Sequence, residues 1–267
     1  MNRLAQTTRA LRARGRSGLV AFLTAGYPDE RSFVAMVRAA VDAGADVVEI
    51  GVPFSDPIAD GPVIQASSSV ALAHGMSLRR ALALASELAA TVDVPLVVMS
   101  YVNPLLAMGT DAFARAAAEA GVAGVILPDV PFEESGAFRT PIREARLDYV
   151  DLIAPTSGDT RIRAIAGAAE GFVYVVSLTG VTGAHHAFAA DLGALTGRVR
   201  AATETPVYVG FGISEPGQAR TVARHADGVI IGSRLLELAA DGAPGGADGR
   251  VGAFLASVRG ALDREGR

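Results

Sequence analysis

Short apolar runs alternate with helix-forming stretches along the whole sequence, and this alternation constrains the fold more than any other feature. Most runs are continuously apolar, as expected for parallel strands that are covered on both faces. Eight such runs occur, at residues 19–24, 46–51, 95–100, 124–128, 149–153, 172–177, 206–209 and 228–231. Eight parallel strands with intervening helices predict an α/β fold of the TIM-barrel type, which commonly takes about 250 residues.

The stretches between the runs have the composition and the stop signals of helices. Helices are expected at residues 29–42, 78–91, 111–119 and 131–145, with an extra helix at the N-terminus and short extra helices in the loops. Ala-Gly steps at 43–44 and 120–121 precede the next run, and glycine commonly ends a helix. We therefore expect one (β/α)8 barrel domain over residues 1–267, with a mobile, glycine-rich surface loop at 241–249.

Two residue types are absent, and their absence excludes several kinds of chemistry. There is no cysteine, and all 24 basic residues are arginine. Thiolate nucleophiles, disulfides, Schiff bases and a P-loop lysine are therefore excluded. The formal net charge of −4, with both signs mixed, argues against a nucleic-acid or membrane partner. We also find no signal-peptide pattern and no apolar run near the ~20 residues of a spanning helix, and so expect a cytoplasmic protein.

The segment DVVEIGVPFSDPIADGP, residues 46–62, combines a buried acid with a second acid in a shaped loop. Glu49 lies at the end of an apolar run, where a carboxylate is costly unless it is paired or used. Asp60 follows in a loop whose prolines restrict its shape. Because the loops after barrel strands line the active face, we interpret Glu49 and Asp60 as a general acid/base pair.

Glycine-rich loops after the later runs suggest how a substrate is held. Gly212 follows the seventh run and Gly232 the eighth, and backbone N–H groups at the starts of the following helices favour an anion. Loops in these two places often bind phosphate in this fold. Residues 177–188 are predicted to form a lid, with an ordinary flexible connection as the alternative. The four histidines show no metal-ligand spacing, so no metal site is expected.

Six segments together resemble the tryptophan synthase alpha subunit family, over essentially the full length of the chain. They are FLTAGYPD (22–29), EIGVPFSDPIADGPVIQ (49–65), PDVPFEES (128–135), LTGVTG (178–183), GFGIS (210–214) and GSRLLE (232–237). The second segment is the most specific, whereas the last two occur in many phosphate-binding barrels. The resemblance implies a retro-aldol cleavage of indole-3-glycerol phosphate to indole and glyceraldehyde 3-phosphate.

The matched positions also imply roles for individual residues. Glu49 would deliver a proton to indole C3 and remove the proton of the side-chain hydroxyl, while Asp60 would accept the indole N–H. Thr182 matches a lid threonine that orders against Asp60, and Leu178 stands where some members carry an arginine, so a lid salt bridge is not expected. The positions that enclose the indole are matched by Phe22, Ile64, Tyr101 and Tyr174, and those of the phosphate cradle by Gly183, Phe211, Gly212, Gly232 and Ser233. From position alone, each of the aromatic residues could equally pack in the core.

The resemblance implies a partner as well, a beta subunit that carries pyridoxal phosphate and receives indole through a tunnel in an alpha-beta-beta-alpha heterotetramer. This chain would carry no cofactor of its own. Its docking surface would comprise Pro53, Phe54 and Asp56 with the loops 101–108 and 130–134. Three alternatives stay open: a stand-alone indole-releasing lyase, another phosphate-barrel isomerase, and a non-catalytic barrel that only activates its partner. The intact pair Glu49 and Asp60 argues against the non-catalytic alternative.

Overall fold

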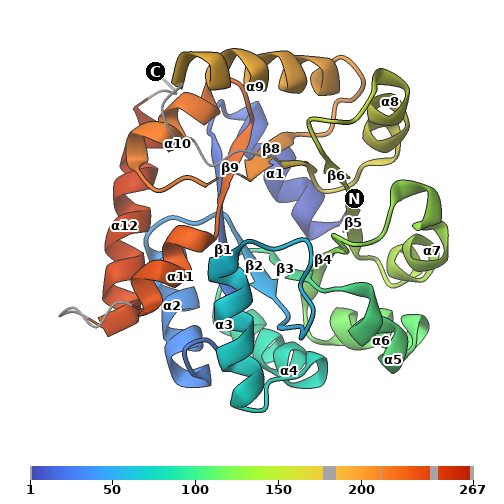
Figure 1. The fold of residues 1–267 in the computed structure, drawn as a ribbon, viewed down its shortest axis with the longest axis vertical. Coiled ribbons are helices and arrows are strands. Elements are labelled where there is room, and N and C mark those ends of the chain that lie inside the picture. The colour runs from blue at the N-terminus through green and yellow to red at the C-terminus, as the bar shows by residue number, and fades with distance from the viewer. Residues whose placement is uncertain (1, 177–184, 211, 241–245, 265–267) are drawn as a thin grey trace.

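The computed structural model describes residues 2–176, 185–210, 212–240 and 246–264, and in this part of the chain a ring of parallel strands is surrounded by helices (Figure 1). The sheet order is β5-β4-β3-β2-β1-β9-β8-β7-β6, and every neighbouring pair is parallel. The strands are β1 (Gly18–Thr24), β2 (Val47–Gly51), β3 (Leu96–Met99), β4 (Val122–Ile126), β5 (Asp148–Val150), β6 (Leu152–Ile153), β7 (Val173–Val176), β8 (Val207–Gly210) and β9 (Gly228–Ile231).

The two ends of this strand order, β5 and β6, are parts of one predicted strand, residues 149–153. A single residue, Asp151, separates them, and its carbonyl still accepts a hydrogen bond from the Tyr174 N–H at 2.9 Å. The divided strand pairs with β4 through its first part and with β7 through its second. The ring therefore closes through this strand, and the predicted TIM barrel is confirmed.

Helices fill the connections between the strands, much as the sequence predicts. They are α1 (Arg3–Ala13), α2 (Glu30–Asp42), α3 (Pro62–Ala73), α4 (Leu78–Ala89), α5 (Val102–Met108), α6 (Thr110–Glu119), the 3-10 helix η1 (Phe132–Glu134), α7 (Gly136–Glu144), α8 (Asp159–Ala168), α9 (His185–Arg200), α10 (Pro216–Ala223), α11 (Ser233–Ala240) and α12 (Gly246–Asp263). Helices α2 and α4 start at side-chain caps, since Asp29 accepts from the Ser32 N–H and Ser77 from the Arg80 N–H. These caps set the first residue of α2 and of α4.

Two predicted elements differ from the structure, and a third lies partly outside the described residues. The helix expected at 131–145 is divided into η1 and α7, because the Ser135 hydroxyl bonds to the Phe132 carbonyl and closes a tight turn first. The loop expected at 241–249 is wrong in its second half, since residues 246–249 already form the first turn of α12, and its first half, 241–245, lies outside the described residues. There Asp248 lies at a helix N-terminus, where its charge is favourable. The segment 177–188, expected as a lid, lies outside the described residues up to 184, and α9 begins at His185.

Helix α1 closes the end of the barrel at which the strands begin. Leu4 of this helix is fully buried and packs with the interior residues of the barrel, among them the stacked rings of Phe172 and Tyr208. Two glycines make room for it, because a Cβ at Gly124 or Gly171 would approach Leu4 Cδ2 to 2.8 or 2.6 Å. With this end filled by side chains, only the opposite end can hold a ligand cavity.

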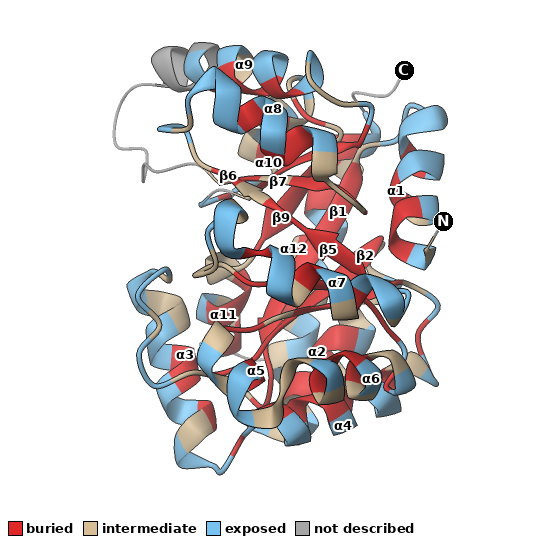
Figure 2. Ribbon diagram, turned by 90° about the vertical axis from the view of Figure 1, so that its right-hand side faces the viewer, coloured by how far each residue is buried: buried red, intermediate tan, exposed pale blue. Residues whose placement is uncertain are grey.

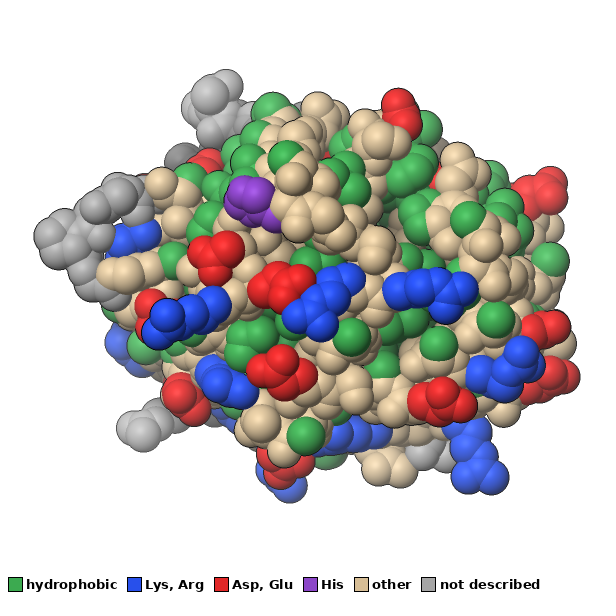
Figure 3. Space-filling view, turned by 90° about the horizontal axis from the view of Figure 1, so that it is seen from below, with side chains coloured by type: hydrophobic (Ala, Val, Ile, Leu, Met, Phe, Trp, Pro, Cys, Tyr) green, Lys and Arg blue, Asp and Glu red, His purple; other side chains and the backbone are tan. Residues whose placement is uncertain are grey.

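The remaining core lies between the strands and the helices. In Figure 2 the strands are buried almost throughout, whereas each helix is buried on the side that faces the strands and exposed on the other. The outer surface carries both charge signs side by side, as Figure 3 shows for the face seen from below. Arg80 of α4 pairs with Glu30 of α2, and Arg38 pairs with Glu87 at 3.7 Å. None of the described helices is long and apolar enough to cross a membrane.

Candidate active site

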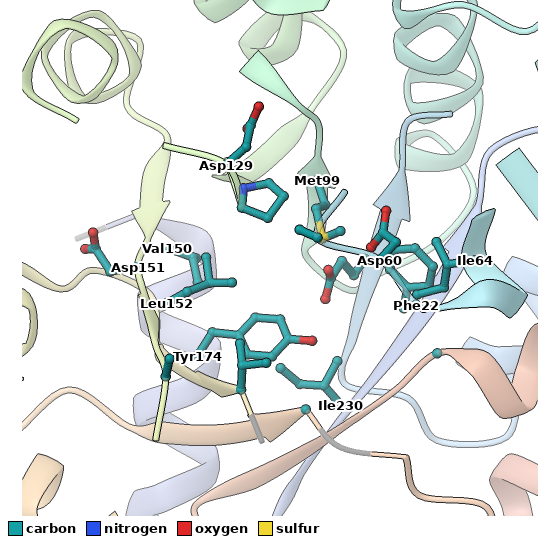
Figure 4. A pocket seen from close by; sticks show the side chains of 18 of the residues that line it. Phe22, Asp60, Ile64, Met99, Asp129, Val150, Asp151, Leu152, Tyr174 and Ile230 are labelled. Carbon is teal, nitrogen blue, oxygen red and sulfur yellow. The ribbon is translucent and has the colours of Figure 1, made fainter. Parts of the chain in front are cut away.

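A cavity of about 830 Å³ opens at the carboxyl ends of the strands (Figure 4). This size suits a small organic ligand, since ligand pockets commonly measure about 300–1,000 Å³. Glu49 and Asp60, the two acids predicted from the sequence, both line it. Further walls come from β1, α3, β7, the loop after β8 and the start of α11. The barrel therefore brings together side chains that lie as far apart in sequence as Phe22 and Ser233.

Glu49 lies within β2, between Phe22 of β1 and Val97 of β3 in the sheet register. It is only 1 % exposed, and neither carboxylate oxygen has a hydrogen-bond partner among the described residues. Burial raises the pKa of Glu49 to about 8, with a further contribution from the charge of Asp60. At neutral pH this acid therefore holds its proton and can donate it to a bound molecule.

Asp60 lies in the segment between β2 and α3, and several hydrogen bonds shape that segment. The Asp60 N–H donates to the Pro57 carbonyl at 3.0 Å, and Gln65 Nε2 donates to the Asp60 main-chain carbonyl at 2.9 Å. The Tyr101 hydroxyl donates to the Asp60 carboxylate at 3.0 Å. Burial raises the pKa of Asp60 to about 6, while the bond from Tyr101 opposes the rise. Asp60 is therefore mostly ionised at neutral pH, in contrast to Glu49, and such a division suits acid/base chemistry.

Apolar and aromatic side chains form the walls beside the two acids. Phe22 and Ile64 lie beside Asp60, and the Tyr174 ring extends from β7 toward this wall (Figure 4). Sequence reasoning missed the glycines that make room for these rings. A Cβ at Gly51 would lie 2.5 Å from the Phe22 ring, and one at Gly210 would lie 2.3 Å from the Tyr174 ring. The sequence signal that could have identified these glycines is their place at the last position of a strand.

Tyr101 was expected to enclose the ligand, but it is not among the residues that line the main cavity. It lines a much smaller space beside it, together with Phe22, Asp60 and Ile64. Its ring stacks on Phe54, with 5.1 Å between centroids and 26° between planes. Tyr101 therefore contacts the acid rather than the open part of the cavity.

The end of the cavity near β8 and β9 has the features of an anion site. Gly212, Gly232 and Ser233 line it, and Ser233 is the first residue of α11. Because the first N–H groups of a helix have no partner within the helix, they can bind an anion there. A Cβ at Gly212 would meet nothing within 4 Å, so this residue borders open space. Thr182, Gly183 and Phe211, predicted to belong to the same site, lie outside the described residues, as does Leu178.

The opposite wall carries two acids that sequence reasoning missed, Asp129 and Asp151. Both carboxylate oxygens of Asp129 accept from the Val102 N–H, at 3.0 and 3.2 Å. Asp151 points away from the centre of the cavity (Figure 4) and accepts from both terminal nitrogens of Arg139, at 2.5 and 3.1 Å. Since both acids are engaged with the protein, they differ from Glu49, whose oxygens are free to meet a ligand.

No group of three or more histidine, aspartate or glutamate side chains suited to a metal ion occurs within the described ranges. Two of the histidines, His185 and His186, are in the first turn of α9 rather than in a loop. The chemical groups that converge on the cavity are thus a neutral carboxyl, an ionised carboxylate, an apolar wall and an anion site. This set fits proton transfer on a planar apolar molecule that carries an anionic group.

Comparison with known proteins places the chain in one family. The family described as tryptophan synthase alpha chain matches residues 8–250. Among its relatives, the tryptophan synthase alpha chain of Burkholderia ambifaria is 47 % identical over 268 residues, covering 100 % of this chain and 99 % of that protein. That of Paraburkholderia phytofirmans is 47 % identical over 264 residues, covering 98 % of each.

Solved structures give the same result. The crystal structure of tryptophan synthase alpha chain from Legionella pneumophila superposes with a TM-score of 0.90 at 36 % identity, covering 99 % of this chain and 98 % of that one. A chain of tryptophan synthase from Mycobacterium tuberculosis superposes with a TM-score of 0.89 at 38 % identity, covering 98 % of both.

Proposed function

The chain belongs to the tryptophan synthase alpha chain family and is a lyase of tryptophan biosynthesis, and we propose that Glu49 and Asp60 perform its reaction. This alpha reaction cleaves indole-3-glycerol phosphate to indole and glyceraldehyde 3-phosphate. The observation that carries the proposal is the state of Glu49, a fully buried carboxyl without a hydrogen-bond partner among the described residues, beside an ionised acid in one cavity. Burying an acid without a hydrogen-bond partner destabilises the fold, and a catalytic role explains why the protein keeps Glu49 at this position.

The two acids divide the proton transfers. Glu49, neutral because its pKa is about 8, donates its proton to C3 of the indole ring. The ring then carries a positive charge, which the Asp60 carboxylate stabilises by accepting the indole N–H. The Glu49 carboxylate formed in the first step takes the proton of the side-chain hydroxyl next to the ring. The C–C bond then breaks, its electron pair returns to the ring, and indole and the aldehyde are released with Glu49 protonated again.

The rest of the cavity positions the substrate for these steps. Phe22, Ile64 and Tyr174 flank the ring, so that C3 lies near Glu49 and the ring nitrogen near Asp60. Gly212, Gly232 and Ser233 receive the phosphate through backbone N–H groups at the start of α11. We assign Gly183 and Phe211 to the same phosphate site and Thr182 to closure over Asp60. Residues 1–267 act together as one domain in this proposal.

The alpha chain has a beta-subunit partner, as its family name implies. We propose that the partner covers the cavity end through Phe54 and Asp56 together with residues 101–108 and 130–134. Pro53, expected from the sequence to belong to this surface, is instead buried in the structure. Exposed apolar side chains support the assignment, since Leu106 within this surface is 53 % exposed and Ile58 beside it is 86 % exposed. In this proposal the assembly is an alpha-beta-beta-alpha heterotetramer, pyridoxal phosphate is held by the beta subunit, and indole passes to it directly.

An indole-release assay with the purified chain tests the proposal. Wild type should release indole from indole-3-glycerol phosphate, and a matching beta subunit should raise the rate. Glu49→Gln should lower kcat by at least about 10²–10⁴-fold while glycerol phosphate affinity stays within about tenfold. Substantial turnover by Glu49→Gln would remove Glu49 from the proton-transfer role. Cleavage that the beta subunit does not change would instead identify a stand-alone lyase.

A further inference from the structure

The hydroxyl of Tyr101 makes two hydrogen bonds to the segment that carries Asp60. It accepts from the Ala59 N–H at 2.9 Å and donates to the Asp60 carboxylate at 3.0 Å. These partners lie 42 and 41 residues away in sequence. One atom therefore holds both the main chain and the side chain of this segment.

The direction of these bonds follows from the chemistry of a phenol. A tyrosine hydroxyl has a single proton and can accept other hydrogen bonds. Because the Ala59 N–H can only donate, it occupies an acceptor position and leaves the proton free to point at Asp60. A donor aimed at a carboxylate favours the charged form. The arrangement thus opposes the burial of Asp60, which favours the neutral form.

The Tyr101 ring is itself held in place. It is 3 % exposed and stacks on Phe54, while the next residue, Val102, is bound through its N–H to Asp129. The position of the hydroxyl is therefore set by packing and by the start of α5, and not by Asp60 alone. A rigid donor of this kind can define where a loop carboxylate lies.

Few other titratable groups face Asp60 in the described part of the chain. Glu49 faces it from β2 and Tyr174 from β7, and the charge of Asp60 raises the pKa of each. Asp129 lies behind Tyr101 and acts on the pKa of that phenol. Among these groups, Tyr101 is the one that donates a hydrogen bond to the Asp60 carboxylate.

We propose that Tyr101 is a positioning residue of the alpha reaction, whose hydroxyl holds the segment of Asp60 in place and keeps its carboxylate ionised. Tyr101 acts on the substrate only through Asp60, in contrast to the role of ring contact expected from its position in the sequence. This inference rests on the role proposed for Asp60 above.

The variant Tyr101→Phe tests it, because phenylalanine keeps the ring and the stack on Phe54 but removes the hydroxyl. Two quantities are measured in wild type and variant: the pKa of Asp60, by carbon NMR of the labelled carboxyl in the ligand-free protein, and kcat/KM against pH. Both the NMR pKa and the acid limb of kcat/KM should rise by about one pH unit. Well below the pH of the wild-type limb, the loss of kcat/KM should reach about tenfold, and it should vanish well above that pH. The alkaline limb should move much less.

Two results would separate the failure of this inference from that of the proposed function. An unchanged NMR pKa of Asp60 in Tyr101→Phe would overturn the inference, whatever happened to the rate. Equal loss of kcat/KM at all pH values would overturn it as well, because it would show that Tyr101 only supports the fold. Absence of indole release by wild type would instead refute the proposed function, and the NMR titration would still report whether the hydroxyl keeps Asp60 ionised.

Discussion

Replacing Glu49 with glutamine should make the protein more stable at alkaline pH. Burial and the charge of Asp60 raise the pKa of Glu49 from its ordinary value of 4.5 to about 8. Below pH 4.5 the Glu49 carboxyl is neutral in both the folded and the unfolded chain, so its ionisation does not lower the free energy of unfolding there. As the pH rises above this value the unfolded chain releases the proton and the folded chain keeps it, which favours unfolding. Above the folded pKa both forms are ionised, and the loss of stability is complete.

The size of this effect follows from the two pKa values. Each pH unit between them lowers the free energy of unfolding by about 1.4 kcal/mol. Across the interval from 4.5 to about 8 the total loss is therefore about 5 kcal/mol. Because stability of a whole domain is typically about 5–15 kcal/mol, such a loss is large. Glutamine has nearly the same size as glutamate but cannot ionise, so the Glu49→Gln variant does not lose this stability as the pH rises.

Urea unfolding of wild type and Glu49→Gln over a range of pH measures the difference directly. The stability of the variant relative to wild type should be small and constant below pH 4.5 and should then increase up to about pH 8. Glu119→Gln, the same chemical change at an exposed position of α6, serves as the control and should follow wild type. A difference between Glu49→Gln and wild type that stays flat across this range would refute the reasoning, since it would mean that Glu49 is not protonated in the folded protein.

Further predictions concern the reaction and the wall opposite the acids. The pH profile of kcat/KM should be bell-shaped, rising with a pKa of about 6 as Asp60 ionises and falling with a pKa of about 8 as Glu49 loses its proton. A profile without an alkaline limb would contradict the role of Glu49. Gly212→Val should raise KM and leave the urea midpoint unchanged, because its side chain would enter open cavity space; an unchanged KM would mean that phosphate binds elsewhere. Arg139→Met should destabilise by about 3–5 kcal/mol in urea unfolding, since it leaves the buried Asp151 unpaired, and adding Asp151→Leu should restore much of the loss. A single variant as stable as wild type would show that this pair does not support the fold.

The sequence predicts the barrel well because the signal for buried parallel strands is local. Continuous apolar runs mark most strands, and even the strand divided at Asp151 is recognisable as one run. Glu49 is recognisable for a similar reason, because an acid inside an apolar run conflicts with burial. Such conflicts between local pattern and global fold are expected at functional sites.

The features that the sequence did not predict all depend on contacts between distant residues. The role of Tyr101 depends on a bond to a carboxylate 41 residues away, which no local pattern encodes. Gly51 and Gly210 read as ordinary strand ends until the rings of Phe22 and Tyr174 are seen beside them. Their function is defined by space in the folded barrel, and only the structure contains that information.

The kind of element that carries each acid explains why the two differ in ionisation. On β2, the main-chain groups beside Glu49 are used in pairing with β1 and β3, so the strand offers its carboxyl no donor and burial keeps it neutral. Asp60 lies on a loop instead, where a side chain from another segment can reach it, and the Tyr101 hydroxyl favours its charge. The charge of Asp60 then raises the pKa of Glu49 further. The ionised acid thus helps to keep the other one protonated, which is the state that the first proton transfer to the substrate requires.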